Sequence, residues 1–278
     1  MRVVLTVLLW LLTTIALAVA VPAAWAQRTV VDVDGYASLA QSAAHDPALQ
    51  NAMASELTAQ MVAIAHNRAV TVDTSRVGVI AAAYTAGSSF PAQFAQANRI
   101  AHQWLFTGIG RQDSNGWVVD LTPMLSDPSF KETLNNLAVE LPSTVTVPVT
   151  ATDGLRPGQL RPVATWGPWI SIGAAVLTGF LALLTLAAAR RRGKALAALG
   201  VSALLVGGGG WAGVEVARGH IDQALTRTTG DVHRIAEVMV AHAETSSHQW
   251  LNWTLVAGGA LVVLGVVSSM IGALFRRA

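Results

Sequence analysis

Residues 169–214 have the sequence WISIGAAVLTGFLALLTLAAARRRGKALAALGVSALLVGGGGWAGV, in which two apolar runs flank the basic stretch Arg190–Lys194. Each run has about 20 residues, which is the length that a helix needs to cross the hydrocarbon core of a bilayer. The glycines at 207–210 are compatible with a membrane helix, because neighbouring helices can satisfy a weakened backbone. This stretch therefore predicts a pair of transmembrane helices joined by a short basic loop.

Two further apolar runs have the same length and composition, Val3–Val21 and Leu251–Leu274. Only 12% of the 278 residues are charged and 53% are hydrophobic, whereas a soluble domain carries about 25% charged residues. The chain is therefore predicted to be an integral membrane protein with four spans.

The distribution of charge predicts the orientation of these spans. Basic residues without acidic neighbours flank one end of them: Arg2, Arg190–Lys194, Arg276 and Arg277. Every Asp and Glu falls in two other segments, residues 27–166 and 218–250, apart from Glu215 at the outer end of the third span. By the positive-inside rule, the protein is a multi-pass plasma-membrane protein with cytoplasmic N and C termini, and these two segments lie outside.

Five regions follow from this topology. They are an N-terminal transmembrane anchor (1–26), an extracytoplasmic helical domain (27–166), two transmembrane helices with their cytoplasmic loop (167–217), an extracytoplasmic helical segment (218–250), and a C-terminal transmembrane helix with its tail (251–278). The small-x-small pattern at Ala24–Gln27 also fits a signal-peptidase site, so a cleaved leader stays an alternative to the anchor. The apolar run before it is longer than a usual leader core, which favours the anchor.

The fold class predicted is mainly α, with a short extended or β element in the outer domain. Asp46-Pro47 is a helix start, and further helices are expected at 75–85 and 89–107. Apolar residues of the last helix recur on one face: Phe90, Phe94, Ala97, Ala101 and Leu105. Asn115-Gly116 predicts a turn, the residues after it and STVTVPVTA (143–151) are β-prone, and helices are expected to restart at Thr122-Pro123 and Asp127-Pro128. In the second segment, Gly230-Asp231 predicts a break, and the stripe with Ile235, Val238 and Met239 is expected to pack on the outer domain.

Several motifs occur in one order along the chain: DVDGY (32–36), HDPALQNAM (45–53), FAQANRIAH (94–102) and VVDLTPML (118–125). With them, the chain resembles a group of uncharacterised actinobacterial integral membrane proteins that have an N-terminal anchor, an extracytoplasmic helical domain with an ANRxAH-like helix, and three further spans. The connector before the second span is shorter here, and the DVDGY motif lacks the usual basic residue before Tyr36. The resemblance implies this architecture and assigns no activity.

Four residues are candidates for a site. Asn98, Arg99 and His102 share one helix at i, i+1 and i+4, and Asp120 follows in the next extended segment. Arg99 can bind a carboxylate through two hydrogen bonds, and Asp120 is the expected partner. One interpretation is a structural clamp between the helix and that segment. The other is an anion or small-ligand pocket, in which His102 adds pH sensitivity near its ordinary pKa of about 6.5.

Other chemistry is not predicted. The histidines of the second segment lack metal-ligand spacing, so they are expected to be exposed helical residues: His220, His233, His242 and His248. The sequence has no cysteine and no nucleophile, phosphate-loop or dinucleotide motif, so no catalytic residue, metal or cofactor is expected. The spans carry no ionisable residue at mid-depth, which argues against a transporter or channel.

The sequence thus favours a non-enzymatic cell-envelope membrane protein, an accessory or scaffold subunit whose outer domain binds another envelope protein, lipid or wall component. The alternative is a ligand- or pH-sensing membrane receptor with a pocket near Arg99 and His102. The expected partners are membrane lipids and either another envelope membrane protein or a second copy of the chain. The small residues Ala203, Gly207, Gly265, Ser269 and Ala273 allow close helix packing within the chain or with such a partner. Nucleic acid is not expected, because the net charge of +2 comes from the membrane flanks.

Overall fold

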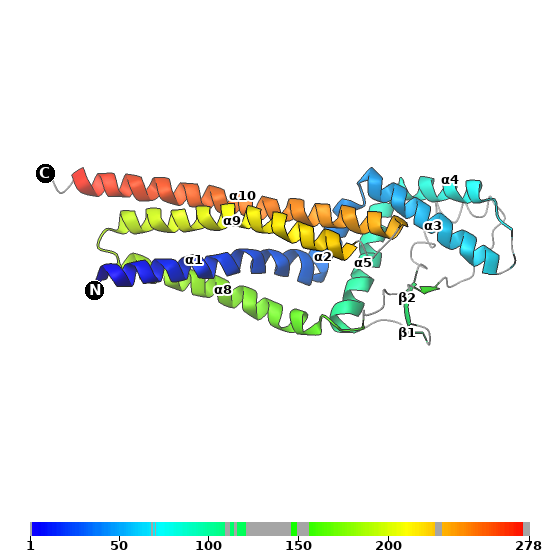
Figure 1. Cartoon of the computed structure of the whole chain (residues 1–278), viewed down its shortest axis with the longest axis horizontal. Helices are drawn as coiled ribbons and strands as arrows, with labels where there is room; N and C mark the ends of the chain where they lie inside the picture. Colours follow the sequence, from blue (N-terminus) through cyan, green and yellow to red (C-terminus); the bar gives the residue numbers. More distant parts are fainter. Residues whose placement is uncertain are drawn as a thin grey trace. The chain divides into compact units, whose positions relative to one another are not determined.

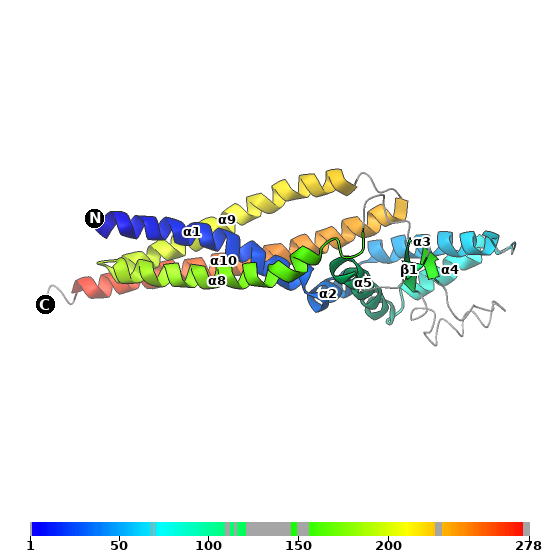
Figure 2. The ribbon, with the colours of Figure 1, turned by 90° about the horizontal axis from the view of Figure 1, so that it is seen from below.

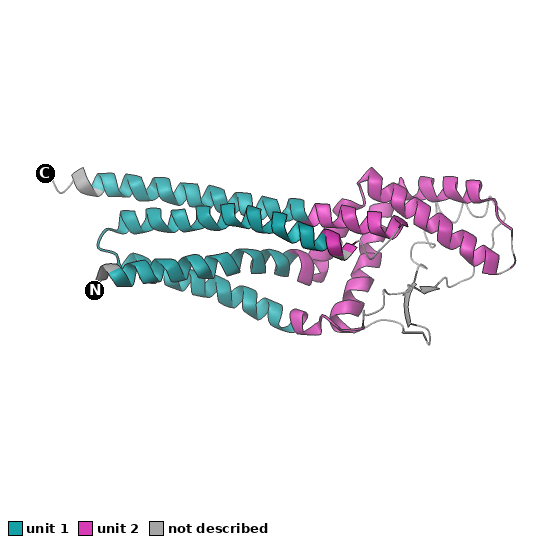
Figure 3. Ribbon diagram, in the orientation of Figure 1, with its two compact units in different colours: residues 1–28, 165–221, 244–278 teal, residues 29–164, 222–243 magenta. Residues whose placement is uncertain are grey.

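A computed structural model describes residues 2–67, 69, 71–108, 112–113, 116–120, 146–148, 156–225 and 230–274. The chain forms two compact units (Figure 3). Unit 1 comprises residues 1–28, 165–221 and 244–278, and unit 2 comprises residues 29–164 and 222–243.

Unit 1 is built from four long helices (Figure 1). They are α1 (Arg2–Ala26), α8 (Arg161–Ala188), α9 (Arg192–Leu225) and α10 (Gly230–Leu274). Three of these helices extend into unit 2, with residues 161–164 of α8, 222–225 of α9 and 230–243 of α10. All four are long and apolar enough to cross a membrane, which confirms the predicted mainly helical fold with four long apolar helices.

A seam of glycines joins α9 to α10. Gly193, Gly200 and Gly207 recur every seven residues on α9 and face Gly258, Gly265 and neighbouring residues of α10. A Cβ at Gly200 would lie 2.6 Å from the carbonyl oxygen of Gly258, and one at Gly265 would lie 2.4 Å from the backbone nitrogen of Ala197. The two backbones are therefore in direct contact, as small residues permit in membrane helices.

Four of the five predicted small residues have a place in this seam, among them Ser269, whose backbone nitrogen would lie 2.8 Å from a Cβ on Gly193. A Cβ on Gly258 would lie 3.0 Å from the Cβ of Ala203, one on Gly207 would meet the side chain of Leu255, and Gly265 opposes Gly193. Their packing is within the chain. The side chain of Ala273 lies outside the described residues.

Hydroxyl groups and one indole connect α1 to its neighbours. The Thr14 hydroxyl is 2.8 Å from that of Ser202 on α9, and the hydroxyls of Thr13 and Thr185 of α8 are 3.3 Å apart. The Trp10 indole donates to the carbonyl of Ala198 at 2.9 Å. These contacts make α1 a packed member of unit 1.

The seam predicts that Gly200→Ala destabilises unit 1, because the added methyl group collides with the backbone of α10. Overpacking of this kind costs about 1–3 kcal/mol. The matched control is Gly209→Ala, since a Cβ there would have no described atom within 4 Å. Thermal unfolding in detergent should show a lower midpoint for Gly200→Ala alone. Equal midpoints for the two variants would contradict the seam.

Unit 2 is a cluster of shorter helices that packs around a small apolar core. Its helices are η1, a π-helix at Gln27–Val31 that begins in unit 1, α2 (Val33–Ala43), α3 (Pro47–Asn67), α4 (Thr74–Thr85) and α5 (Phe90–Thr107). The core contains alanines of α2, Leu49 of α3, and Phe90 and Phe94 of α5. Val238 of α10 is buried among them, with Ile235 and Met239 beside it. The expected packing of this stripe on the outer domain is confirmed.

The helix starts follow from capping. The Asp46 carboxylate accepts a hydrogen bond from the Ala48 amide at 2.8 Å, so α3 begins where the sequence predicts. Helix α2 is not among the sequence predictions. It begins after Asp32, whose carboxylate accepts from the Gly35 amide at 2.8 Å. The break predicted at Gly230 is confirmed, because α10 starts there with a positive φ of 71°.

Among the described residues after α5, three short strands pair in the order β1-β2-β3, and both pairs are antiparallel. They are β1 (Gln112–Asp113), β2 (Gly116–Asp120) and β3 (Thr146–Pro148). The predicted turn residue Asn115 and the helices predicted after Thr122 and Asp127 lie outside the described residues. Beyond β3, the backbone amides of Gly158 and Leu160 donate to the carbonyls of Trp104 and Leu105, which closes the C-terminal end of α5.

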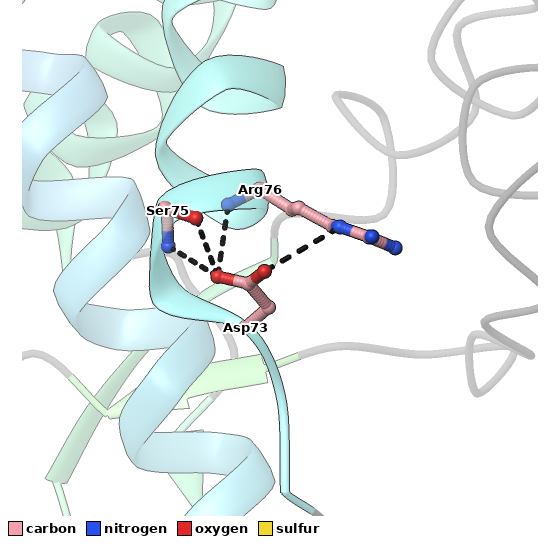
Figure 4. A network of polar contacts seen from close by, with 3 residues as sticks. All are labelled: Asp73, Ser75 and Arg76. Atoms are coloured by element: carbon pink, nitrogen blue, oxygen red, sulfur yellow. Dashed lines mark hydrogen bonds and ion pairs between the residues drawn. The ribbon is translucent and has the colours of Figure 1, made fainter.

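Helix α4 begins with a carboxylate cap (Figure 4). Asp73 accepts hydrogen bonds from the hydroxyl and the amide of Ser75 at 2.5 and 2.9 Å, and it pairs with Arg76 at 3.4 Å. The Ser75 hydroxyl, followed by the Ser75 amide, lowers the pKa of the Asp73 carboxyl below its ordinary value of 3.8. The folded-state pKa is depressed, so the cap is present at neutral pH. It is lost only as the pH falls below this ordinary value and through the lowered pKa.

This cap predicts that Asp73→Ala increases amide hydrogen exchange in residues 74–85, because the first amides of α4 lose their acceptor. Asp73→Asn should keep slow exchange, since asparagine caps a helix about as well as aspartate. Hydrogen exchange read by mass spectrometry distinguishes the two variants. Fast exchange in both of them would mean that the charge, and not the cap geometry, holds the helix start.

Candidate functional site

The predicted site residues lie on α5, whose buried face differs from the prediction. Phe90 and Phe94 are buried as expected, but Ala97, Ala101 and Leu105 are only partly buried. The second half of α5 buries His102, Trp104 and Phe106. His102 has only 6% of its surface exposed, so it belongs to the interior and not to a polar face.

His102 makes three contacts that account for its burial. Its Nε2 lies 2.9 Å from the carbonyl oxygen of Val30. A carbonyl can only accept, so this nitrogen carries the proton and donates. The imidazole ring stacks on Phe106 with centroids 4.1 Å apart and lies 5.2 Å from the ring of Tyr36.

The Val30 carbonyl needs such a donor because it lies at the end of η1. The last carbonyls of a helix lack partners within that helix, and a buried unpaired carbonyl is costly. Asp32 is already the N-cap of α2, so η1 ends at Val31 and does not continue far enough to supply a donor for the Val30 carbonyl. His102 thus caps one helix from the side of another, and this contact connects the chain leaving α1 to α5.

Arg99 makes a second connection between α5 and the start of α2. Its Nη2 is 2.8 Å from the Asp34 carboxylate, and the two side chains are 38% and 78% exposed. The prediction that Arg99 pairs with Asp120 is therefore not what the described residues show. Asp34 lies in the first turn of α2, where a negative charge is also favoured by the helix dipole. An ion pair this exposed contributes only about 0–1 kcal/mol.

The other two predicted residues do not converge on this position. The Asn98 amide donates to the carbonyl of Phe94 on its own helix at 2.9 Å. Asp120 is the last residue of β2, with its backbone paired to Thr146 of β3, and its side chain lies outside the described residues. The cluster that the structure brings together therefore consists of Arg99 and His102 with Asp34, Tyr36 and the Val30 carbonyl.

Tyr36 completes this cluster. Its ring lies beside the imidazole of His102, and burial raises the pKa of its phenol above the ordinary value of 10.0. The phenol therefore stays neutral at any physiological pH. Asp34 and Tyr36 belong to the DVDGY motif, but nothing in the sequence indicates that this motif meets residues 99 and 102.

One polar atom of the cluster has no hydrogen bond. The Nε of Arg99 is buried and has no partner among the described residues. Apart from this donor, the cluster offers a salt bridge and a buried histidine that is already bound. This arrangement can hold three segments together, and it leaves one hydrogen-bond donor, the Nε of Arg99, without a described partner.

Three of the four histidines of the second segment contact backbone carbonyls. The Nδ1 atoms of His220, His233 and His242 lie 2.9–3.0 Å from carbonyl oxygens, and His248 stacks on Trp211 with centroids 3.8 Å apart. No group of three or more potential metal ligands is found in the part of the chain that the structure describes.

Comparisons with protein-family models, curated proteins and solved structures give no match to this chain.

The cluster predicts that His102→Ala destabilises unit 2 by about 1–3 kcal/mol, because the half-buried Val30 carbonyl loses its donor and the buried imidazole is removed. His45→Ala is the matched control, since His45 is exposed and binds only the Gln41 carbonyl of its own helix. Thermal unfolding in detergent should show a loss for His102→Ala, and a change within about 0.5 kcal/mol for His45→Ala. An unchanged midpoint for His102→Ala would show that the contact does not support the fold.

Proposed function

We propose that this protein is a non-enzymatic membrane protein of the cell envelope, an accessory or scaffold subunit whose unit 2 binds another envelope protein. The observation that carries the proposal is the engagement of Arg99, His102 and Asn98 in contacts within unit 2. Side chains that are already bound in this way support a surface for a partner better than they support catalysis.

An orientation with N and C termini inside is part of this proposal. The basic residues at 190–194 lie in the connection after α8 and in the first turn of α9, and Trp169 lies toward the other end of α8. Trp169 and Trp253 are 71% and 67% exposed, as expected for side chains at a membrane interface. About 21 residues separate Trp169 from Arg190, or about 31 Å of helix, which matches a hydrocarbon core of about 30 Å.

An uncleaved N-terminal anchor is also proposed. The contacts of Trp10, Thr13 and Thr14 with α8 and α9 support it, because cleavage after α1 would remove them from unit 1. Membership of the actinobacterial group stays a prediction from the motifs.

Helix α4 is the proposed contact surface for the partner. Val79 is 71% exposed, and Ala82, Ala83 and Ala86 are exposed on the same helix and just beyond its end. In the described part of unit 2, Val163 and Val232 are the other exposed large apolar residues, at 44% and 49%. An apolar face on α4 is suited to a protein partner, whose interface core is apolar, and not to a small polar ligand.

The test is a mild-detergent pull-down of the full chain from native membranes, read by mass spectrometry. A stoichiometric partner should co-purify with the wild type and should be lost from Val79→Asp. The control is Asn51→Asp, which adds the same charge at an exposed polar position of α3 and should keep the partner. The folded fraction of His102→Ala should still bind the same partner. A wild-type chain that elutes without any stoichiometric partner would refute the accessory role.

The spare Nε of Arg99 favours a second candidate, the ligand- or pH-sensing receptor. A small carboxylate or phosphate that competes with Asp34 for the guanidinium would then stabilise the protein. A thermal shift with acetate or inorganic phosphate that disappears in Arg99→Gln would favour this candidate. The absence of this thermal shift in the wild type would argue against the receptor and favour the accessory role.

A further inference from the structure

A cavity of about 580 Å³ lies at the basic end of unit 1 and is lined by α1, α8, α9 and the connection between the last two. Its volume is in the range of pockets that hold small molecules. The candidate cluster around His102 belongs to unit 2, so the cavity is a separate feature that the proposed function does not use.

Three cations line one part of this cavity: Arg190, Arg191 and Lys194. All three side chains are exposed, and none makes an ion pair or a side-chain hydrogen bond with a described residue. Residues 1–31, 154–214 and 245–278 contain no Asp or Glu. The two carboxylates of unit 1, Glu215 and Glu244, are not among the residues that line the cavity, so the lining concentrates positive charge without an acidic residue to neutralise it.

The remaining walls are mostly apolar, and their polar groups have partners. Val7 and several alanines contribute methyl groups, the Trp10 indole donates to the Ala198 carbonyl, and the Thr185 hydroxyl donates to the Leu181 carbonyl at 2.8 Å. The three cations are thus the groups that remain to recognise a polar part of a ligand. A matching ligand has an anionic head and an apolar body.

We propose that this cavity binds one anionic phospholipid, with its phosphate on Arg190, Arg191 and Lys194 and an acyl chain against Val7 and Trp10. Guanidinium groups bind phosphate oxygens in pairs, and basic pockets between membrane helices take anionic headgroups. A free phosphate ion matches only the charged part, because the apolar walls offer nothing to replace its hydration shell.

The test uses the full chain purified in mild detergent, with lipid binding read by native mass spectrometry. The probes are dioleoylphosphatidylglycerol, dioleoylphosphatidylcholine and inorganic phosphate. One phosphatidylglycerol should bind at least about tenfold more tightly than phosphatidylcholine, and phosphate at the same concentration should not displace it. The triple variant Arg190→Gln, Arg191→Gln, Lys194→Gln should lose this preference.

Two pairs of variants separate the cavity from a general attraction of basic residues for lipid. Arg191→Gln should weaken phosphatidylglycerol binding about fivefold, whereas its neighbour Arg192→Gln removes the same charge outside the cavity lining and should not. Val7→Trp fills the cavity without changing its charge and should also weaken binding, in contrast to Val4→Trp, which lies outside the cavity lining on the same helix and is 63% exposed.

Equal effects of Arg191→Gln and Arg192→Gln would overturn the proposal, as would equal affinity for the two lipids. Displacement of the lipid by inorganic phosphate would show a site for a free anion and would also overturn it. Loss of binding in Arg191→Gln and Val7→Trp, with retention in both controls, supports the lipid site.

Discussion

The four long helices of unit 1 are apolar enough to cross a membrane, and lipid removes the force that usually drives helices together. An apolar side chain gains little by leaving hydrocarbon for a protein interior, so membrane helices associate through close packing and hydrogen bonds. Most of the large apolar side chains of unit 1 are accordingly exposed: Leu8, Phe180, Leu183, Val256 and Leu264 all have more than half of their surface open. The glycine seam between α9 and α10 and the hydroxyl contacts of α1 provide the attraction that burial cannot. Figure 2 shows the long helices α1, α8, α9 and α10 in a second view.

Unit 2 is stabilised in the opposite way, because it buries apolar side chains in a core. Alanines of α2 let the aromatic residues of α5 approach closely, and Leu49 and Phe90 are completely buried. Its polar contacts then complete helix ends: Asp32, Asp46 and Asp73 cap helix starts, and His102 caps the Val30 carbonyl. Asn98 and His102 of α5 thus bind backbone carbonyls, and the Nε of Arg99 is the donor of this motif without a described partner.

The sequence predicts those features that depend on composition or on neighbours along the chain. Uninterrupted apolar runs indicate the four long helices, and a capping residue followed closely by proline marks the helix starts near residues 46 and 90. It does not predict contacts between distant segments. Several acidic residues could pair with Arg99, and only the approach of α2 to α5 selects Asp34. His102 looks polar on a helical wheel, yet it is buried because η1 ends beside it. The cavity beside residues 190–194 is formed by three helices at once, so this basic stretch alone indicates only orientation.

We propose above all that the apolar bundle of unit 1 spans the membrane and that unit 2 and the C-terminal end of α9 lie on its outer side. The chain has no cysteine, so single cysteines can report this directly. Exposed positions suit this test: Ala59→Cys in α3, Gly219→Cys in α9 and Arg192→Cys at the start of α9 would be treated in intact cells with a membrane-impermeant maleimide. Labelling of positions 59 and 219, with position 192 labelled only after permeabilisation, is the expected result. Labelling of position 192 in intact cells, or protection of either of the other two, would contradict the account.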